Sequence, residues 1–503
     1  MIGRSLSCAA FVVALSYFAE PSFAQTPNNT VFVGGLVTPV DLAFSGPDRL
    51  YVVERRGTVR LVQNGVLRPQ PLLDLCEEIG DFDDCAMTGI ALDPAFAENG
   101  RLYLTYVVDR HHLLHFDTPS YSPTTNEFHA ATIGRVTRYT CDAATGFTTI
   151  VPGSRVVLVG ESLDNAPAVT APSHASCSLQ FGSDGTLLVG FGDGAWSGGV
   201  DAGSSPSSYY AQALVDGILQ PAANVGAFRA QQIDSMNGKI LRIDPATGDG
   251  VASNPFFVAK EPRCARSRVW SLGLRNPFRM SVRPGTGSTD PTLGRPGDLY
   301  IGDVGWTLHE EIDIATVGGQ NFGWPVFEGM DPEPQYGALW IANPFAPNPL
   351  AGRGCGLPFF RFRDLLQQDN CGNLVFTNPC DTNTSIPLAT PTFRHTLPAL
   401  DWMHEVADTR VAVRTNGVVN FQQVGAPASG VVGVPFTGNC AIGGTWHSGL
   451  TFPPTFGPCY YVADFLGGWI KRLEFDQSGR VTSIAPFANV TLPVRLVEGP
   501  DQA

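Results

Sequence analysis

The chain is poor in charge, since Asp, Glu, Lys and Arg together make up 16% of its 503 residues. Acidic residues outnumber basic ones by 46 to 32, which gives a net charge of −14 at pH 7. Lysine is especially scarce and occurs only at Lys239, Lys260 and Lys471. A chain with so little positive charge is poorly suited to capturing the phosphates of nucleic acid. We therefore expect no nucleic-acid partner.

Long hydrophobic runs are also absent. A membrane-spanning helix needs about 20 consecutive apolar residues, and no segment after residue 24 approaches that length. The first 24 residues combine Arg4, the apolar run Ala9–Tyr17 and a small-residue site at Ser22-Phe23-Ala24, the pattern of a secretory signal. We expect a signal peptide over residues 1–24, a periplasmic or secreted mature protein, and no membrane span.

No Cys-x-x-Cys pair occurs, which argues against zinc ribbons and thioredoxin-type chemistry. Of the 11 cysteines, Cys8 lies in the predicted signal, and an even number remains. An even number in an exported chain favours disulfides. Cys76–Cys85 and Cys371–Cys380 are candidate local bridges, although spacing alone does not fix the connectivity.

Long amphipathic helices are missing as well, and short strands recur instead. The repeated unit is an apolar strand, a turn rich in Gly, Pro or Asp, and a second strand, as in Val40–Phe44 followed by Leu50–Val53. Many short antiparallel strands are typical of a β-propeller, which hides its sheet edges by closing on itself. A pair of β-sandwiches is the alternative. We find no linker, so we expect an all-β chain with one domain over residues 25–503 and long insertions near 198–232 and 329–387.

The stretch Ser267–Gly329 concentrates unusual polar residues at predicted strand ends. Arg275 and Asn276 precede a proline that ends regular pairing, and Glu310, Glu311 and Asp313 crowd acid into one segment. Binding residues are commonly placed on loops above a rigid sheet. This stretch therefore predicts a ligand site.

Eight stretches follow one another along the chain: DRLYVVERRGTVRLVQNG, TGIALDPAFAENGRLYLTY, SHASCSLQFGSDGTLLVGFGDG, NGKILRIDPATG, WSLGLRNPFRMSV, GDLYIGDVGWTLHEEIDI, QNFGWPVFEG and ADFLGGWIKRLEF. In this order they resemble the soluble quinoprotein glucose/sorbosone dehydrogenase family. The resemblance implies a six-bladed β-propeller that oxidises the C1 hydroxyl of an aldose to a lactone, with pyrroloquinoline quinone (PQQ) and calcium as cofactors. With no haem-attachment motif in the chain, electrons would pass to an external acceptor.

The resemblance assigns roles to four positions. His174 matches the general base, a task that suits an imidazole because its unperturbed pKa is near neutrality. Arg275 and Asn276 match an Arg-Asn-Pro turn in which the arginine stabilises charge on the quinone. Asp84 stands where relatives carry a cofactor-contacting glutamine. Around His174 the chain departs from the family's glycine-rich pattern.

The resemblance also implies two calcium sites. The backbone carbonyls of Gly305 and Trp306 match the loop that holds the cofactor's calcium, which takes several oxygen ligands. Glu311 and the carbonyl of Phe322 match a second, structural calcium site in some relatives. A solvated acidic loop is the simpler interpretation of Glu310 and Glu311.

Some departures favour other functions. The turn at Asp464–Gly468 lacks the cations that pair with the carboxylates of PQQ in relatives, so we consider Arg394 or Arg414 as substitutes. Without them, a non-catalytic propeller that binds a protein or glycan partner is the alternative, and a lactonase-type hydrolase is a third, based on fold analogy. The pair His111 and His115 has metal-ligand spacing but lacks the glutamate of an HExxH motif.

Overall fold

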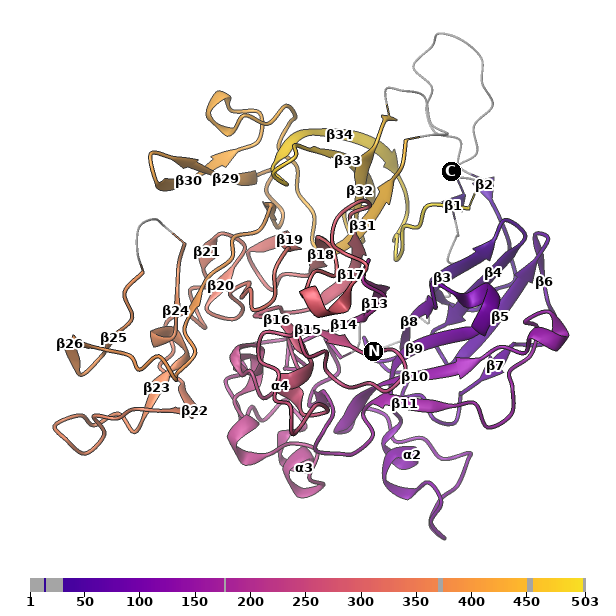
Figure 1. The fold of residues 1–503 in the computed structure, drawn as a ribbon, viewed down its shortest axis with the longest axis horizontal. Helices are drawn as coiled ribbons and strands as arrows, with labels where there is room; N and C mark the ends of the chain where they lie inside the picture. The colour runs from indigo at the N-terminus through magenta and orange to yellow at the C-terminus, as the bar shows by residue number, and fades with distance from the viewer. Residues whose placement is uncertain (1–12, 15–29, 176–177, 370–373, 450–455, 501–503) are drawn as a thin grey trace, which may run out of the picture.

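The computed structural model describes residues 13–14, 30–175, 178–369, 374–449 and 456–500. The predicted signal peptide at 1–24 lies almost entirely outside these residues. Within them the fold is all-β, with five antiparallel sheets of four or more strands arranged as a propeller (Figure 1). The first strand of each sheet contacts the first strand of the next, in the order β3, β8, β13, β17 and β31. These strands therefore surround a common axis.

The strands of the first three blades follow the predicted repeat. The first blade has β3 Pro39–Gly46, β4 Arg49–Glu54, β5 Thr58–Gln63, β6 Val66–Leu67 and β7 Leu73–Asp74. The second has β8 Met87–Leu92, β9 Arg101–Val107, β10 Thr132–Thr140, β11 Val156–Val159 and β12 Ala168–Val169. The third has β13 Ser178–Phe181, β14 Leu187–Phe191, β15 Lys239–Ile243 and β16 Val269–Leu272.

The last two blades differ in size. The fourth has six strands, β17 Pro277–Val282, β18 Leu299–Asp303, β19 His309–Ala315, β28 Leu400–Met403, β29 Thr409–Thr415 and β30 Val418–Gln423. The fifth has β31 Ala441–His447, β32 Cys459–Asp464, β33 Trp469–Phe475 and β34 Val481–Asn489. A further strand pair joins β1 Val13–Ala14 to β2 Thr30–Val31.

The prediction of six blades is wrong, because the described residues form five. The segment between β19 and β28 builds four two-stranded sheets in place of another blade, and it projects from the propeller at the left of Figure 1. We call residues 316–399 the insertion. Its strands are β20 Phe327–Glu328, β21 Asp331–Pro332, β22 Ala342–Pro347, β23 Phe359–Arg361, β24 Leu366–Gln367, β25 Thr377–Asn378, β26 Asp381–Ser385 and β27 Phe393–Arg394.

Helices in the described part of the chain are short. The α-helices are α1 Phe96–Asn99, α2 Arg110–His115, α3 Tyr210–Val215 and α4 Ala265–Arg268. The 3₁₀ helices are η1 Ala143–Thr145, η2 Pro221–Ala223, η3 Gly226–Gln231, η4 Pro291–Leu293, η5 Phe362–Asp364 and η6 Pro427–Ser429. Among the residues that the structure describes, no helix has the length and apolar character needed to cross a membrane.

Apolar contacts between blades form the core. Strands such as β4 and β9 are buried along nearly their whole length, as their unbroken apolar runs predict. One cluster of buried residues joins the first and second blades, and another joins the fourth and fifth. Where β18 meets β31, a Cβ on Gly302 would lie 2.1 Å from the backbone nitrogen of Gly443. Glycine is required there so that two blades can approach closely.

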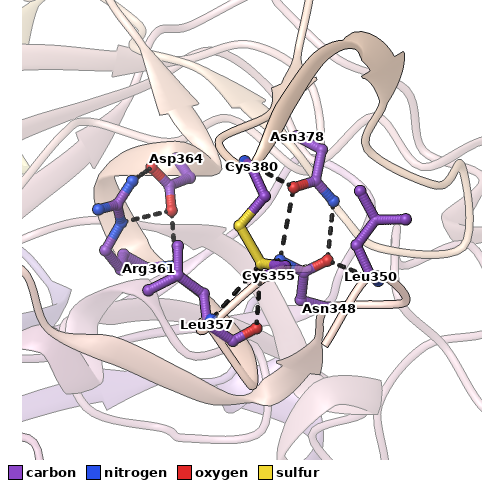
Figure 2. The surroundings of a disulfide bond; sticks show 8 residues. All are labelled: Asn348, Leu350, Cys355, Leu357, Arg361, Asp364, Asn378 and Cys380. Atoms are coloured by element: carbon purple, nitrogen blue, oxygen red, sulfur yellow. Dashed lines mark hydrogen bonds and ion pairs between the residues drawn. A yellow bond between two sulfur atoms is a disulfide. The ribbon is translucent and has the colours of Figure 1, made fainter. Parts of the chain in front are cut away.

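The disulfide predictions also need correction. The structure joins Cys355 to Cys380 in the insertion (Figure 2), so Cys380 does not pair with Cys371, which lies outside the described residues. Cys76 and Cys85 are both free. The pairing reflects tertiary contact: the neighbouring Asn348 and Asn378 hydrogen-bond each other at 2.7 Å and hold the two segments together.

Candidate functional site

His174 lies in the loop before β13, where it hydrogen-bonds a buried carboxylate. Its Nδ1 is 2.9 Å from Oδ1 of Asp193, and the exposed fractions of the two residues are 5% and 1%. Burial alone would raise the pKa of the Asp193 carboxyl, but the adjacent His174 and Arg275 hold that pKa below its usual value. An ionised Asp193 accepts the Nδ1 proton, which leaves the imidazole lone pair on Nε2. The histidine is therefore oriented to act as a base.

Asp193 is fixed by further hydrogen bonds. Its Oδ1 also accepts from the backbone N–H of Ala195 at 3.0 Å, and its Oδ2 accepts from the indole Nε1 of Trp324 at 2.8 Å. The backbone N–H of Asp193 donates to the carbonyl of Arg275 at 2.8 Å. Its own carbonyl accepts from Nη2 of the buried Arg229 at 3.0 Å. The carboxylate thus has one position, which fixes the histidine in turn.

Arg275 lies beside this pair. Its side chain is buried, and its Nη1 donates to the carbonyls of Val304 at 2.8 Å and Gly305 at 2.6 Å. Its guanidinium carbon is 5.5 Å from the ring centre of Trp324, a cation–π distance. Because Trp324 also bonds Asp193, the structure brings the predicted base and the predicted arginine into one network.

Asp303, at the end of β18, fixes the Arg-Asn-Pro turn. Its Oδ2 accepts from the backbone N–H of Arg275 at 2.8 Å, and its Oδ1 accepts from that of Asn276 at 2.6 Å. Burial raises the pKa of Asp303 to about 7, although these two amides act in the opposite direction. Asn276 is therefore held next to Arg275 by the same carboxylate.

Asp84 approaches the site through its backbone. Its N–H donates to the carbonyl of Pro172 at 3.2 Å, two residues before His174. The side chain of Asp84 is exposed. The predicted cofactor-contacting position therefore lies next to the histidine loop.

Glu328 of β20 organises the loop that contains Gly305 and Trp306. A single oxygen of Glu328, Oε1, accepts from four successive backbone N–H groups at 2.6 to 3.3 Å, those of Trp306, Thr307, Leu308 and His309. The indole of Trp306 donates to the carbonyl of Ser197 at 2.8 Å. The loop is held by an acid that lies about twenty residues away in the sequence.

The Gly305 loop does not fit a calcium ion in this arrangement. The Gly305 carbonyl already accepts from the Arg275 guanidinium at 2.6 Å, so an ion bound there would sit against a positive charge. We therefore assign no ion to the carbonyl of Gly305.

Glu311 and Phe322 occupy different environments. Glu311 is buried on β19 next to Asp303 and Asp313, with the ligand oxygens of all three within 4.8 Å of one another. Burial, followed by repulsion from Asp313, raises the pKa of Glu311 well above its usual value. Phe322 is buried among apolar side chains, and its backbone N–H donates to the carbonyl of Leu272 at 2.9 Å.

A second imidazole lies near Arg275. Nε2 of His404 is 2.7 Å from Oε1 of the fully buried Glu310. Burial alone would lower the pKa of His404, but Glu310 raises it above its usual value. Oε2 of Glu310 accepts from the backbone N–H of Gly305 at 3.2 Å, which ties this pair to the loop.

Sequence reasoning missed four residues of the site: Asp193, Trp324, Glu328 and His404. Asp193, Trp324 and Glu328 lie inside stretches that carry the family resemblance, and the acid in GFGDG beside a strand end was the available signal for Asp193. Glu328 and His404 act through contacts across long sequence distances, which no local pattern reveals.

The arginines considered as PQQ-binding substitutes are engaged elsewhere. Arg394 and Arg414 both form ion pairs with Asp369 of the insertion, at 2.7 and 2.6 Å. Lys239 is buried, and its Nζ donates to three backbone carbonyls. Around the site, the described cations include Arg275 and the buried Arg229, which donates to the carbonyl of Asp193.

The model of the glucose/sorbosone dehydrogenase family matches residues 36–337, which is more than half of the chain and includes the whole His174–Arg275 network. The chain belongs to this family. The HIPL1 protein of Arabidopsis thaliana is 26% identical over 288 residues, which cover 52% of this chain and 36% of the plant protein. The chain thus spans about a third of that relative. An aldose sugar dehydrogenase of Escherichia coli strain K12 is 33% identical over 97 residues, 19% of this chain and 22% of that enzyme.

Solved structures agree on the fold. A protein from Thermus thermophilus described as a putative oxidoreductase (glucose dehydrogenase) aligns with a TM-score of 0.51 at 19% identity, covering 94% of this chain and 90% of its own. Another structure titled glucose dehydrogenase has a TM-score of 0.52 at 16% identity, covering 93% and 92%. At these identities the likeness shows the propeller fold alone.

Proposed function

We propose that this family member is an exported, PQQ-dependent sugar dehydrogenase. It oxidises the C1 hydroxyl of an aldose to a lactone and passes the electrons to an external acceptor. The observation that supports this proposal most is the His174–Asp193 pair in one network with Arg275. Membership of the family supports the proposed substrate class and cofactor. The Cys355–Cys380 disulfide suits an oxidising compartment.

Each residue of the network has a task in this proposal. Bound PQQ would be the acceptor of the hydride that leaves C1 of the sugar. His174 takes the hydroxyl proton on Nε2, and the negative Asp193 stabilises the imidazolium that results. Arg275 places positive charge where negative charge develops. Trp324 keeps the acid and the guanidinium in fixed positions.

The test is reconstitution of the purified full-length protein with PQQ and calcium. PQQ binding is followed by absorbance, and activity is followed by reduction of an artificial acceptor dye with a panel of aldoses. The proposal expects saturable PQQ binding and dye reduction that requires both PQQ and sugar. Dye reduction without added PQQ, or no PQQ binding at all, would reject it.

A non-catalytic propeller that binds a protein or glycan remains the second candidate. The observation that favours it is the pairing of Arg394 and Arg414 with Asp369, because it leaves few cations to hold the three carboxylates of PQQ. Glycan binding without PQQ binding in the same reconstitution would establish this candidate.

A further inference from the structure

The insertion contains a pocket of about 350 Å³ in the part that carries β20, β21 and β24 (Figure 1). Val326, Phe327 and Leu366 are buried and form its apolar walls, and Pro332 and Pro334 are exposed at its opening. Ligand pockets in proteins have volumes of about 300 to 1,000 Å³ and are mostly apolar, with a few polar groups that orient the ligand. This pocket therefore has the size and lining of a site for a small organic molecule.

Two charged side chains line the pocket at different depths. Glu333 is fully buried, and its Oε1 has no hydrogen-bond partner among the residues that the structure describes. Arg363, at the end of η5 nearest β24, is exposed. A molecule that enters the pocket would therefore meet a positive charge at the opening and an acid at greater depth.

The positive charge of Arg363 is held in place without being neutralised. The adjacent acid, Asp364, is engaged by Arg361, whose Nε and Nη2 donate to its two oxygens, both at 2.7 Å. Arg363 forms no ion pair with any residue that the structure describes. Its guanidinium carbon instead lies 4.5 Å from the ring centre of Trp340, a cation–π distance. Trp340 orders the guanidinium, whose donors remain available to an anion.

The pocket is distinct from the candidate site but adjacent to it in the chain. His174, Asp193 and Arg275 do not line it. Phe327 in its wall is followed directly by Glu328, which holds the Gly305 loop. A ligand of this pocket would bind beside the site rather than in it.

We propose that this pocket binds a small organic acid that has an apolar ring and one carboxylate. Arg363 pairs with the carboxylate, because a guanidinium presents its donors in a plane that matches the two carboxylate oxygens. The ring packs against the apolar walls. Glu333 offers no positive charge to a second carboxylate, so a monocarboxylate is preferred to a dicarboxylate. The inference does not depend on the proposed function, since no quinone or sugar takes part.

Titration of the full-length protein with benzoate tests the proposal, with binding followed by ligand-observed NMR in the absence of PQQ and sugar. Benzamide is the neutral probe of nearly the same shape, and acetate is the carboxylate without the ring. We expect saturable binding of benzoate with a Kd of at most about 1 mM, within reach of a ligand of this size. Both other probes should bind at least about tenfold more weakly. No saturable binding of benzoate, or equal affinity for either of the other probes, would overturn the proposal.

Arg363→Met removes the charge and keeps an unbranched apolar stem. We expect the affinity for benzoate to fall at least about tenfold, because the carboxylate loses its charged partner. Arg353→Met is the matched control, since Arg353 is an exposed arginine of the insertion that does not line the pocket. Full affinity for benzoate in Arg363→Met, or an equal loss in Arg353→Met, would overturn the proposal.

Ala338→Phe tests the location of the ligand. Ala338 lines the pocket at an exposed position, so a phenyl group there would occupy the space assigned to the ring of benzoate. We expect saturable binding to be lost while the Tm stays that of the wild type. Normal binding in Ala338→Phe would place benzoate elsewhere and overturn the proposal. Because the assay contains no quinone or sugar, its failure is distinguishable from failure of sugar oxidation.

Discussion

At the scale of single residues, the position of the imidazole proton of His174 depends on the hydrogen-bond partner of each ring nitrogen. Asp193 accepts the proton from Nδ1 of His174 and also from the indole of Trp324. The tautomer that leaves Nε2 free is thus set by a carboxylate that the fold places 19 residues further along the chain. Sequence analysis identified the histidine through its family pattern but not the acid, because the pairing exists only after β13 and β14 have formed.

Asp193→Asn tests this dependence. The amide of the asparagine can donate to Nδ1 of His174, which would move the imidazole proton to Nε2 and remove the base. We expect the rate of PQQ-dependent sugar oxidation to fall by about 10³- to 10⁴-fold with the fold intact, as measured by dye reduction and circular dichroism. Asp48→Asn, at an exposed turn, should retain full activity. Normal activity in Asp193→Asn would contradict the assignment.

His395 makes stability depend on pH. Burial lowers the pKa of its imidazole to about 3, against about 6.5 in an unfolded chain. As pH falls from 6.5 towards 3, the unfolded chain binds a proton that the native chain does not, so the free energy of unfolding decreases. We expect a loss of about 2 kcal/mol between pH 6.5 and 5 from this residue. Urea unfolding at both pH values should show a smaller difference in His395→Phe, and an unchanged difference would contradict this account.

At the scale of elements, loops rather than strands carry the site, and one acid determines the shape of the loop. Glu328 of β20 gathers four amides of the loop at 306–309, while the carbonyls of Val304 and Gly305 receive Arg275. The apolar runs predicted where strands form, because central strands of a blade are buried on both faces. The apolar runs did not predict the conformation of the loop at 304–309, because the acid that holds it, Glu328, belongs to the insertion.

Glu328→Ala should loosen that loop. Four backbone amides would lose their acceptor, and each unsatisfied buried amide costs about 1–3 kcal/mol unless water replaces the acceptor. We expect hydrogen exchange at 304–309 to speed up at least about tenfold, while β31 and β32 keep their protection. Unchanged exchange at 304–309 would show that Glu328 does not hold the loop. Glu98→Gln, which changes an exposed acid on α1, is the control and should leave exchange at 304–309 unchanged.

At the scale of the whole molecule, the ring closes through charged side chains. Arg495, near the end of the described chain, is 3.0 Å from Asp41 of β3, and the buried Arg279 donates to the carbonyls of Val40 at 2.7 Å and Val494 at 3.0 Å. Family resemblance predicted a propeller correctly but not the number of blades. The insertion explains the difference, because its segments fold as two-stranded sheets and leave the fourth blade with six strands.

Arg279→Met should weaken this closure. The change keeps an unbranched apolar stem but removes the donors to the carbonyls of Val40 and Val494, at a cost of about 2–6 kcal/mol. We expect a lower Tm for the whole propeller in a single calorimetric transition. Arg394→Met, in the insertion and half exposed, should leave that transition unchanged. A normal Tm in Arg279→Met would show that closure does not depend on this residue.

The most direct test of the central claim is single-turnover reduction of bound PQQ by an aldose, followed by stopped-flow absorbance. The account predicts rapid reduction by the wild-type protein and by His115→Gln, whose imidazole lies away from the site on α2. It predicts a rate at least about 10²-fold lower for His174→Gln, with PQQ binding retained. Equal rates in His174→Gln and the wild type would contradict it.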